Sequence, residues 1–243
     1  MPKPPPKKFL PHGIALLHED CDLLAIAKPD GLLSVPARYD PEKNALALMT
    51  NFLRKGQAKS RKELFAVNRL DRETSGVLLF AKSLAARERM HENWSEETEK
   101  IYIAVLAGAL ENDSGTLESF LVQDDDYRVH SVRDASAPGA KLARTDFEVV
   151  RRGNGFTTVL ARIFTGRKNQ IRVQFADAGH ALLGDKMYGR APAKRLALHA
   201  WRIAFSQPRT REKIELEAPI PEFFSRYLPP EFFPKNLPRE RSR

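Results

Sequence analysis

Short apolar runs separated by turn-forming residues recur along the chain and predict several β-strands. Residues 23–29 are typical of a buried strand, which Pro29 ends, and residues 77–83 predict a second strand. Residues 100–108 alternate, so that Tyr102 and Ala104 lie on one face of a strand and Ile101, Ile103 and Val105 on the other. Further strands are expected at 115–121, 143–150, 155–164 and 202–208, with Gly153-Asn154-Gly155 as a hairpin turn between two of them.

Helical spacing is found in fewer segments. Residues 42–52 predict a helix whose apolar side is formed by Leu46, Met49 and Leu53. Ser83 suits the N-cap of a helix through 84–94. Asn169 is the expected cap of a short helix over 170–179 that ends at Gly179. The buried side of that helix is predicted to carry Ile171, Phe175 and Ala178.

Strands therefore outnumber helices, and tight turns join several of them. This favours an α+β fold on a mixed, mostly antiparallel sheet with flanking helices. Residues 11–232 contain no low-complexity linker and no internal repeat, so we expect one domain there. The segments 1–10 and 233–243 are rich in proline and basic residues and are expected to be tails that stay mobile or lie along a polyanion.

The charge of the chain changes this picture by adding a class of partner. Lys and Arg number 40 and Asp and Glu 31, a net charge of +9. Such an excess attracts polyanions, of which nucleic acid is the commonest, although a basic enzyme without such a partner has the same composition. The stretch 54–72 holds seven basic residues against two acidic ones and leads straight into the segment 67–76. Distribution thus favours the nucleic-acid interpretation.

Several other classes of protein are not supported. The only cysteine, Cys21, cannot form an intrachain disulfide and is expected to be a buried structural thiol in a cytoplasmic protein. No secretory signal or bilayer-length apolar run is present, so no membrane partner is predicted. The glycine motifs of nucleotide-binding folds and metal-ligand spacing among the six histidines are missing. The carboxylates at 124–126 are interpreted as a solvated turn rather than a cation site.

Three segments carry candidate chemistry. In residues 67–76, Arg69 and Asp71 flank one leucine, which is usually a pair bracing a loop but can also be a reactive carboxylate. In residues 165–189, Arg167 and Arg172 stand at the two ends of a turn into a helix. A buried arginine there needs a carboxylate to neutralise it, and Asp71 is the natural candidate. Tyr102 projects from its strand, where most tyrosines simply pack.

Together these segments resemble the RluA-type pseudouridine synthases over most of the chain. The motifs that carry the resemblance occur in the family's order. They are Lys28-Pro29-Asp30-Gly31-Leu32, the N-R-L-D-x-x-T-S-G segment Asn68 to Gly76, the strand Lys100 to Gly108, the run Gly166 to Gly189, and Leu196 to Ala200. Several motifs in order are far more specific than any one of them. The resemblance implies a single catalytic domain with a central cleft, without the small basic RNA-binding domain that many relatives carry in front.

The resemblance also implies an activity and a set of roles. The enzyme would isomerise uridines in structured RNA, in stem-loops of ribosomal RNA, transfer RNA or both, without a metal or cofactor. Asp71 would be the essential carboxylate, acting at C1′ of the sugar or C6 of the base, and Arg172 would keep it ionised. Tyr102 would stack on the target base and handle a proton at C5, and Leu198 would pack on its other side. Arg69 would fill the space of the flipped nucleotide or contact its backbone.

Other residues complete the prediction. The basic residues Lys55, Lys59, Lys62 and Arg167 would hold RNA phosphates without reading sequence. Asn68, Asn169 and Gln174 stand where the family more often has histidine, which bears on RNA choice and on how the loop around Asp71 is held. The enzyme is expected to be a monomer. Two alternatives stay open: a catalytically inactive RNA-binding protein or chaperone on the same fold, and an unrelated carboxylate-dependent hydrolase.

Overall fold

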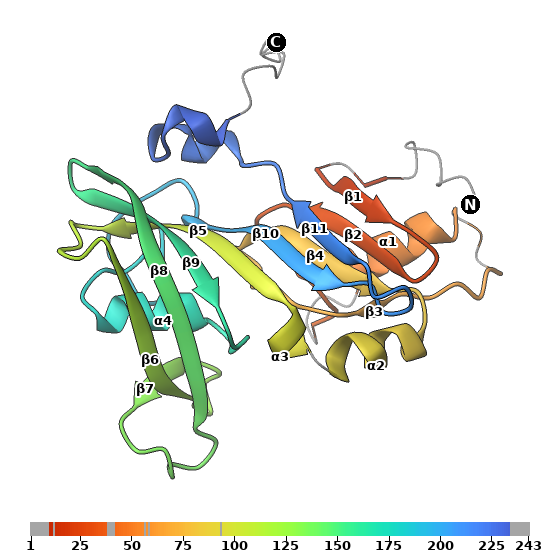
Figure 1. Cartoon of the computed structure of the whole chain (residues 1–243), viewed down its shortest axis with the longest axis horizontal. Helices are drawn as coiled ribbons and strands as arrows, with labels where there is room; N and C mark the ends of the chain where they lie inside the picture. The colour runs from red at the N-terminus through yellow and green to blue at the C-terminus, as the bar shows by residue number, and fades with distance from the viewer. Residues whose placement is uncertain are drawn as a thin grey trace.

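One mixed sheet runs through the molecule in the computed structural model, which describes residues 10–11, 13–37, 42–55, 57, 59–92 and 94–233 (Figure 1). Its strand order is β1-β2-β4-β10-β5-β9-β8-β6-β7, with β3 beside β4 and β11 beside β10. All pairings in the described part are antiparallel except that of β4 with β10. The expected mixed, mostly antiparallel sheet is thus confirmed. The predicted tails lie outside the described residues, apart from Leu10 and Phe233.

The strands of the first half are β1 Ala15–Glu19, β2 Leu23–Lys28, β3 Phe65–Ala66, β4 Ser75–Ala81 and β5 Glu99–Ala107. Those of the second half are β6 Ser114–Gln123, β7 Val129–Val132, β8 Lys141–Gly153, β9 Phe156–Ile163, β10 Leu198–Ser206 and β11 Lys213–Glu217. The helices are α1 Ala45–Leu53, α2 Leu84–Glu92, α3 Trp94–Glu97 and α4 Gln170–Asp177, followed by short 3-10 turns at Glu222–Arg226 and Pro230–Phe232. Strand β10 comes late in the sequence but lies between β4 and β5, so a C-terminal strand joins the two halves of the sheet.

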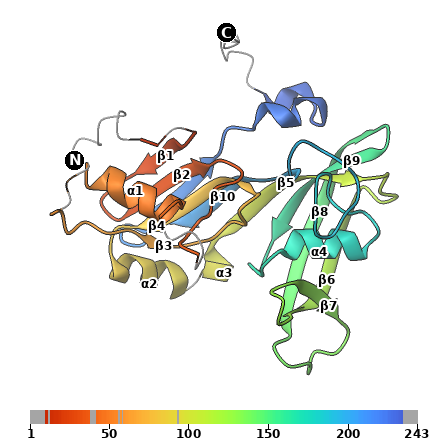
Figure 2. The same ribbon diagram turned by 180° about the vertical axis from the view of Figure 1, so that it is seen from behind.

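The first half of the sheet is covered on both faces, which is why its strands are continuous apolar runs. Leu24 and Phe80 point to the face covered by α1, where Met49 and Phe52 pack on them. The alternate residues of β2 and β4 point to the opposite face, where they pack with Ala86 and Met90 of α2. The two helices can be seen on either side of the strands in Figure 2.

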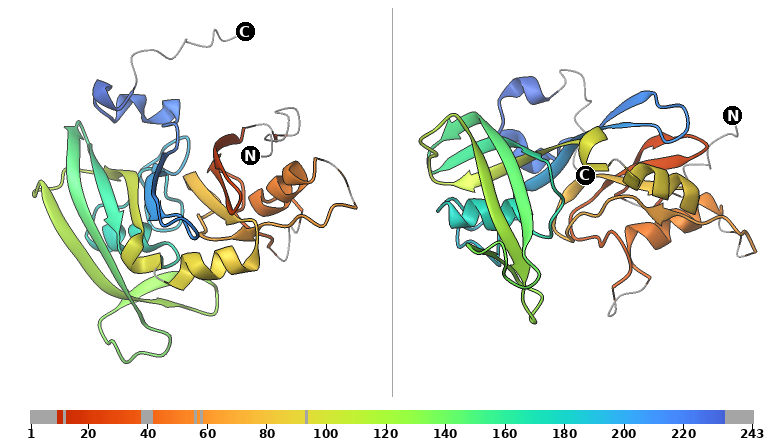
Figure 3. Two further views of the ribbon diagram at one scale, coloured as in Figure 1. Left: turned by 45° about the vertical axis from the view of Figure 1, so that its right-hand side comes forward. Right: turned by 60° about the horizontal axis from the view of Figure 1, so that its bottom comes forward.

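The second half of the sheet has a similar arrangement. Ala104 and Leu106 of β5 pack with Ile171 and Phe175 of α4, whereas Ile103 and Val105 face Phe224 of the 3-10 segment. This confirms the predicted split of the strand into two faces, with Tyr102 on the α4 side. Strands β6 and β8 run on as a long arm, seen best in Figure 3, and α4 lies against β6 and β7. No helix of the described residues is long and apolar enough to cross a membrane.

Most sequence-predicted elements are confirmed, with boundaries that shift by a few residues. Helix α1 begins at Ala45 rather than at 42, because the side chain of Asn44 accepts from the backbone of Ala47 and caps it (3.0 Å). Ser83 caps α2 as predicted (3.1 Å to the amide of Ala86), but that helix ends at Glu92. The predicted strand at 202–208 begins earlier, at Leu198. Strands β1, β3, β7 and β11 were not predicted.

Helix α4 corrects two expectations about its ends. Asn169 has a left-handed backbone (φ 55°) and makes no side-chain cap. Gly179 does end the helix: its amide donates to Ala176 and that of His180 to Phe175, the two bonds of a Schellman motif. Ala178 is exposed, not buried. The residues from Gln170 to Phe175 are all buried, because the helix has the sheet on one side and the arm on the other.

Candidate active site

A pocket opens between the two halves of the sheet and gathers residues from distant parts of the sequence. Asp71 comes from the loop between β3 and β4, Tyr102 from β5, Arg172 from α4 and Leu198 from β10. Arg69 and Arg167 also line the pocket, as do Leu70, Thr74, Ile163, Gly166, Asn169, Gln170 and Ile171. Every residue predicted to contact the target nucleotide therefore lies around one cavity.

The loop that carries Asp71 is fixed by bonds on both sides of the carboxylate. The Ser34 hydroxyl donates to the carbonyl of Leu70 (2.7 Å) and accepts from the amide of that residue (2.9 Å). The amide of Thr74 donates to the carbonyl of Asp71 (3.1 Å). Asn68 binds β4, accepting from the amide of Leu79 (2.8 Å). The side chain of Asn68 therefore bonds to the backbone of β4 and braces the loop, and it does not line the pocket.

Lys28 explains the first of the family motifs. Its side chain is buried, and its amine donates to the carbonyls of Pro29 (2.9 Å), Leu32 (2.7 Å) and Arg72 (3.1 Å). It thus joins the loop after β2 to the loop of Asp71. Burial lowers the pKa of Lys28 to about 7, against the attraction of Asp30 and Asp71.

Arg172 has a different principal partner from the one expected. The guanidinium makes two short bonds to Asp185 (2.7 and 2.8 Å), whereas its nearest atom to Asp71 is 3.7 Å away. Asp185 lies in the loop between α4 and β10, where it also accepts from the amides of Met187 and Tyr188. Asp185 is therefore the main neutralising carboxylate of the buried arginine, and Asp71 is a second, looser one.

The Asp71 carboxylate lines the pocket, with 30% of its side-chain surface exposed. Burial raises its pKa above the ordinary value, and the charge of Glu73 acts in the same direction. Arg172, Lys28 and Lys168 oppose the rise without cancelling it. The expectation that Arg172 favours the ionised form is correct in sign, but burial is the larger effect.

The pocket wall beside Asp71 also carries the apolar side chain of Leu198, the ring and hydroxyl of Tyr102 and the guanidinium of Arg69. Leu198 pairs with Ala104 in the sheet, and Tyr102 is next along the same strand face. Burial, and then Asp71, raise the pKa of Tyr102 far above its ordinary value, so its hydroxyl stays protonated at neutral pH. Arg69 is exposed and makes no hydrogen bond or ion pair with another described residue. Nothing in this part of the chain ties it to Asp71.

Asn169 and Gln174 play unlike parts. Asn169 lines the pocket, accepts from Arg172 (3.0 Å) and donates to the Tyr188 hydroxyl (3.1 Å), so it orients the arginine from a backbone conformation that asparagine tolerates well. Gln174 lies outside the pocket, where its amide donates to the carbonyls of Leu117 (3.1 Å) and Ala143 (3.0 Å). It fastens α4 to strands β6 and β8.

A buried polar chain beside the pocket was not anticipated. Arg195 donates to the Ser75 hydroxyl (2.7 Å) and pairs with Asp30 (2.9 Å). Ser75 is 2.8 Å from Nδ1 of His199, whose Nε2 faces the carbonyl of Ala218 at 3.5 Å. The donors thus assign a neutral His199 with its proton on Nε2. Burial lowers the pKa of His199 to about 4. Ser75 and His199 lie within quoted motifs, but only the fold brings them together.

The predicted phosphate-binding residues separate into two groups. Arg167 lies at the pocket, where its Nε donates to the carbonyl of Leu142 (2.9 Å). Lys55, Lys59 and Lys62 are exposed on the segment between α1 and β3. That segment meets the sheet where Phe65 pairs with Ala81, at the far end of β4 from Ser75, which is about 20 Å away at the usual rise of a strand.

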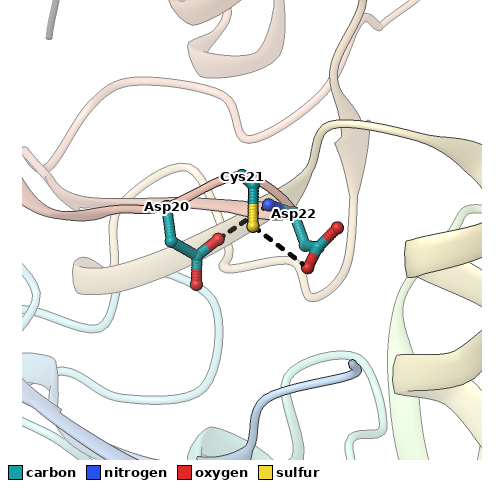
Figure 4. A group of neighbouring side chains, drawn as sticks. All are labelled: Asp20, Cys21 and Asp22. Atoms are coloured by element: carbon teal, nitrogen blue, oxygen red, sulfur yellow. Dashed lines mark hydrogen bonds between the residues drawn. The ribbon is translucent and has the colours of Figure 1, made fainter. Parts of the chain in front are cut away.

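One group of possible metal ligands, Asp20, Cys21 and Asp22, is present among the described residues, in the turn between β1 and β2 (Figure 4). Asp20 accepts from the amides of Asp22 and Leu23, and Asp22 pairs with Arg209 (3.2 Å). These carboxylates serve a turn and an ion pair. The prediction of a buried thiol is wrong: Cys21 is exposed, and the guanidinium of Arg209 lies against its sulfur.

Comparison with known proteins identifies the class. The model of the RNA pseudouridylate synthase family matches residues 22–177. The chain belongs to this family: it is an RluA-type pseudouridine synthase, an isomerase that acts on RNA. The alternative of an unrelated hydrolase is thereby excluded.

Individual relatives agree with this assignment. The dual-specificity RNA pseudouridine synthase RluA of Haemophilus influenzae is 35% identical over 84% of this chain and 91% of its own. The uncharacterized RNA pseudouridine synthase YlyB of Bacillus subtilis is 33% identical over 87% of this chain and 71% of its own. Among solved structures, human RNA pseudouridylate synthase domain containing 1 has a TM-score of 0.68 at 25% sequence identity, over 88% of this chain and 86% of its own.

Proposed function

We propose that the enzyme converts specific uridines in stem-loops of ribosomal RNA, transfer RNA or both to pseudouridine, as a monomer, with Asp71 as the essential carboxylate. The observation that carries this proposal is the position of Asp71 in the pocket wall, 3.7 Å from the buried Arg172 and with Tyr102 and Leu198 lining the same pocket. A relative named for the ribosomal large subunit supports ribosomal RNA as a substrate, and a relative named for dual specificity supports more than one kind of RNA.

The reaction requires that the bond from C1′ to N1 breaks, that the base turns, and that C1′ joins C5. Asp71 has to be ionised to attack C1′ or C6, and the cations near it make this possible although burial opposes it. Its carboxylate is not locked in a short ion pair, because Asp185 takes the two short bonds of Arg172. A carboxylate held in this way has cations close by and is still free to react.

Tyr102 and Leu198 would enclose the uracil ring. The Tyr102 hydroxyl stays protonated, so it would serve proton transfer at C5 as a neutral group that accepts one proton while passing on another. The target uridine must leave its base stack to reach a carboxylate inside this pocket. The unpaired guanidinium of Arg69 at the rim is suited to fill the vacated stack, since a planar cation stacks well on bases.

Replacement of Asp71 tests this proposal. We expect Asp71→Asn to abolish isomerisation, because the amide is no nucleophile, and to leave RNA affinity nearly unchanged, because the amide has almost the same shape. Small structured RNAs should be treated with each protein and pseudouridine mapped by chemical labelling, with binding measured in parallel. Asp22→Asn, in the distant β1–β2 turn, is the matched control and should retain full activity.

Two results would contradict the proposal. Turnover that survives in Asp71→Asn would make that residue structural. Binding without turnover by the wild-type chain, on every ribosomal and transfer RNA supplied, would favour the inactive RNA-binding alternative.

A further inference from the structure

The turn between β6 and β7 presents an aromatic ring that is hardly packed against the rest of the protein. Tyr127 is 73% exposed, so its ring is hardly packed. Its backbone is left-handed (φ 61°), a conformation that costs a bulky residue about 1 kcal/mol. A glycine or asparagine would suit that position better. A ring kept at a backbone cost and without packing is a reason to look for a binding role.

The backbone that carries the ring is fixed by several hydrogen bonds. The amide of Tyr127 donates to Asp124 (3.0 Å), and its carbonyl accepts from the Lys168 amine (2.8 Å). That amine lies 5.6 Å from the centre of the Tyr127 ring. Arg128, the next residue, donates to the carbonyl of Met187 (3.1 Å), and the amide of Val129 donates to the Tyr188 hydroxyl (3.2 Å). This turn, called the tip of the arm below, is thus bonded to both loops that flank α4.

This tip is continuous with the active-site pocket. The ring of Tyr188 lies between two guanidinium groups, 5.3 Å from Arg172 and 5.6 Å from Arg128. Arg172 approaches Asp71, and Arg128 adjoins Tyr127. On the other side Lys168 stands between Arg167 and Asn169, which both line the pocket. An RNA strand with one nucleotide at Asp71 therefore has Tyr127 as a neighbouring surface.

We propose that Tyr127 is a stacking platform for an unpaired base that flanks the target uridine; this rests on the proposed function, because it concerns the same RNA loop. The chemistry of the surface selects this partner. An exposed flat ring with a cation over one face suits a base and its phosphate. The amines of Lys168 and of the exposed Lys186 would face the RNA backbone, and the exposed side chain of Met187 adds apolar area.

The acidic residues of the same turn define which part of the RNA lies where. Asp124 is used within the turn, accepting from the amide of Arg128 (2.7 Å). Asp125 and Asp126 are exposed and repel phosphate. The base, which is neutral, therefore lies over Tyr127, and the backbone passes on the side of Lys168. A duplex, whose bases are already stacked on one another, offers nothing to this ring.

The test uses an RNA hairpin with a uridine-containing loop and a blunt duplex of the same stem. All proteins carry Asp71→Asn so that no turnover occurs. We expect the added change Tyr127→Asn to weaken hairpin binding roughly 5- to 150-fold, the range that loss of one base–aromatic stack gives. Duplex binding should not change. Asn tolerates the left-handed backbone, so the turn itself is kept. Tyr127→Phe retains the ring and should bind like the parent, as should Leu84→Ala, which removes an exposed apolar side chain on α2.

Each contrary outcome has a definite meaning. Equal hairpin binding by parent and Tyr127→Asn overturns the platform. Equal losses on hairpin and duplex also overturn it, because they indicate a general electrostatic contact. If sedimentation shows a dimer that Tyr127→Asn dissociates, the surface is a contact between protein copies and the proposal is again wrong. A wild-type chain that makes pseudouridine while Tyr127→Asn binds normally sinks this inference alone, whereas a chain that makes none sinks the proposed function.

Discussion

At the scale of single residues, the site is organised by which charges are satisfied and which are left over. Arg172 is buried and cannot remain without a carboxylate, and Asp185 meets that need with two short bonds. Asp71 receives the field of the arginine at a longer distance. Its raised pKa means that the native state favours protonation there, so the ionised carboxylate costs stability as the pH rises. The enzyme thus keeps a carboxylate that is costly to ionise at the position where the reaction needs it.

His199 gives a prediction about pH and stability. Its folded pKa is about 4, below an ordinary value of 6.5, so the unfolded chain binds the proton more strongly. Stability contributed by the neutral ring is therefore complete above the ordinary pKa and is lost as the pH falls towards 4. We expect the free energy of unfolding to fall between pH 7 and pH 5 by on the order of 2 kcal/mol more in the wild type than in His199→Gln.

Urea unfolding of both proteins at the two pH values measures this difference. Gln can accept from Ser75 and does not titrate, so the comparison isolates the imidazole. Identical pH dependence in the two proteins would show that burial does not hold His199 neutral in the folded state. The exposed His130→Gln serves as the control and should change the pH dependence little.

How far the sequence predicts single residues depends on whether their role is local. Asp71, Tyr102, Arg172 and Leu198 stand in motifs whose order identifies the family, and the pocket contains them all. The partner of Arg172 was not predicted correctly, because Asp185 lies in another loop and pairing depends on how that loop folds back. The side chain of Asn169 likewise bonds to Arg172, three residues on, and to Tyr188, and the second bond depends on how a separate loop folds back.

At the scale of elements, the junction of β4 and β10 determines the site. These strands run parallel, with His199 opposite Ser75 and Ala200 opposite Gly76. Gly76 has φ 128°, and a Cβ there would lie 2.2 Å from the carbonyl oxygen of Ala200. Thr74 and Leu198, which border this junction, both line the pocket. Close backbone contact at a glycine therefore sets the distance between the two halves of the cavity.

Gly76→Ala is expected to destabilise the protein by about 3 kcal/mol or more, because strand backbone cannot yield as a flexible side chain can. The rate of pseudouridine formation should fall as well. Gly155→Ala is the control: it also has a positive φ (76°) but nothing within 4 Å of the new Cβ, so it should cost only about 1 kcal/mol of conformational strain. Denaturant unfolding of both variants decides the matter. Equal losses would mean that strain, and not the approach of β10, governs position 76.

The elements that sequence could and could not predict differ in length and setting. Buried runs such as β2 and β4 carry a strong apolar signal. Strand β11 alternates clearly from Lys213 to Glu217 and could have been recognised by the same rule. Strand β3 has two residues and β7 four, too short for any period to be read. The cap at Asn44 was missed because the polar residues before it extend the helical pattern.

At the scale of the whole molecule, cations far from the pocket are predicted to extend the contact with RNA. Changing Lys55, Lys59 and Lys62 together to Ala should weaken binding of all RNAs and lower the slope of log affinity against log salt by up to about three. Titrations of one hairpin at several salt concentrations measure the slope. Lys213→Ala, on β11, is the single-charge control. An unchanged slope would place the RNA track on the side of Arg167 and Lys168 instead.

The place of β10 in the sheet has a consequence for synthesis on the ribosome. Translation makes β4 and β5 long before β10, yet β10 fills the gap between them and brings Leu198 to the pocket. Until residue 206 has emerged, both earlier strands have an open edge towards that gap. A nascent chain of this enzyme, surrounded by ribosomal RNA, therefore has no assembled site. Modification can begin only after β10 has left the exit tunnel, and premature release exposes edges that favour aggregation.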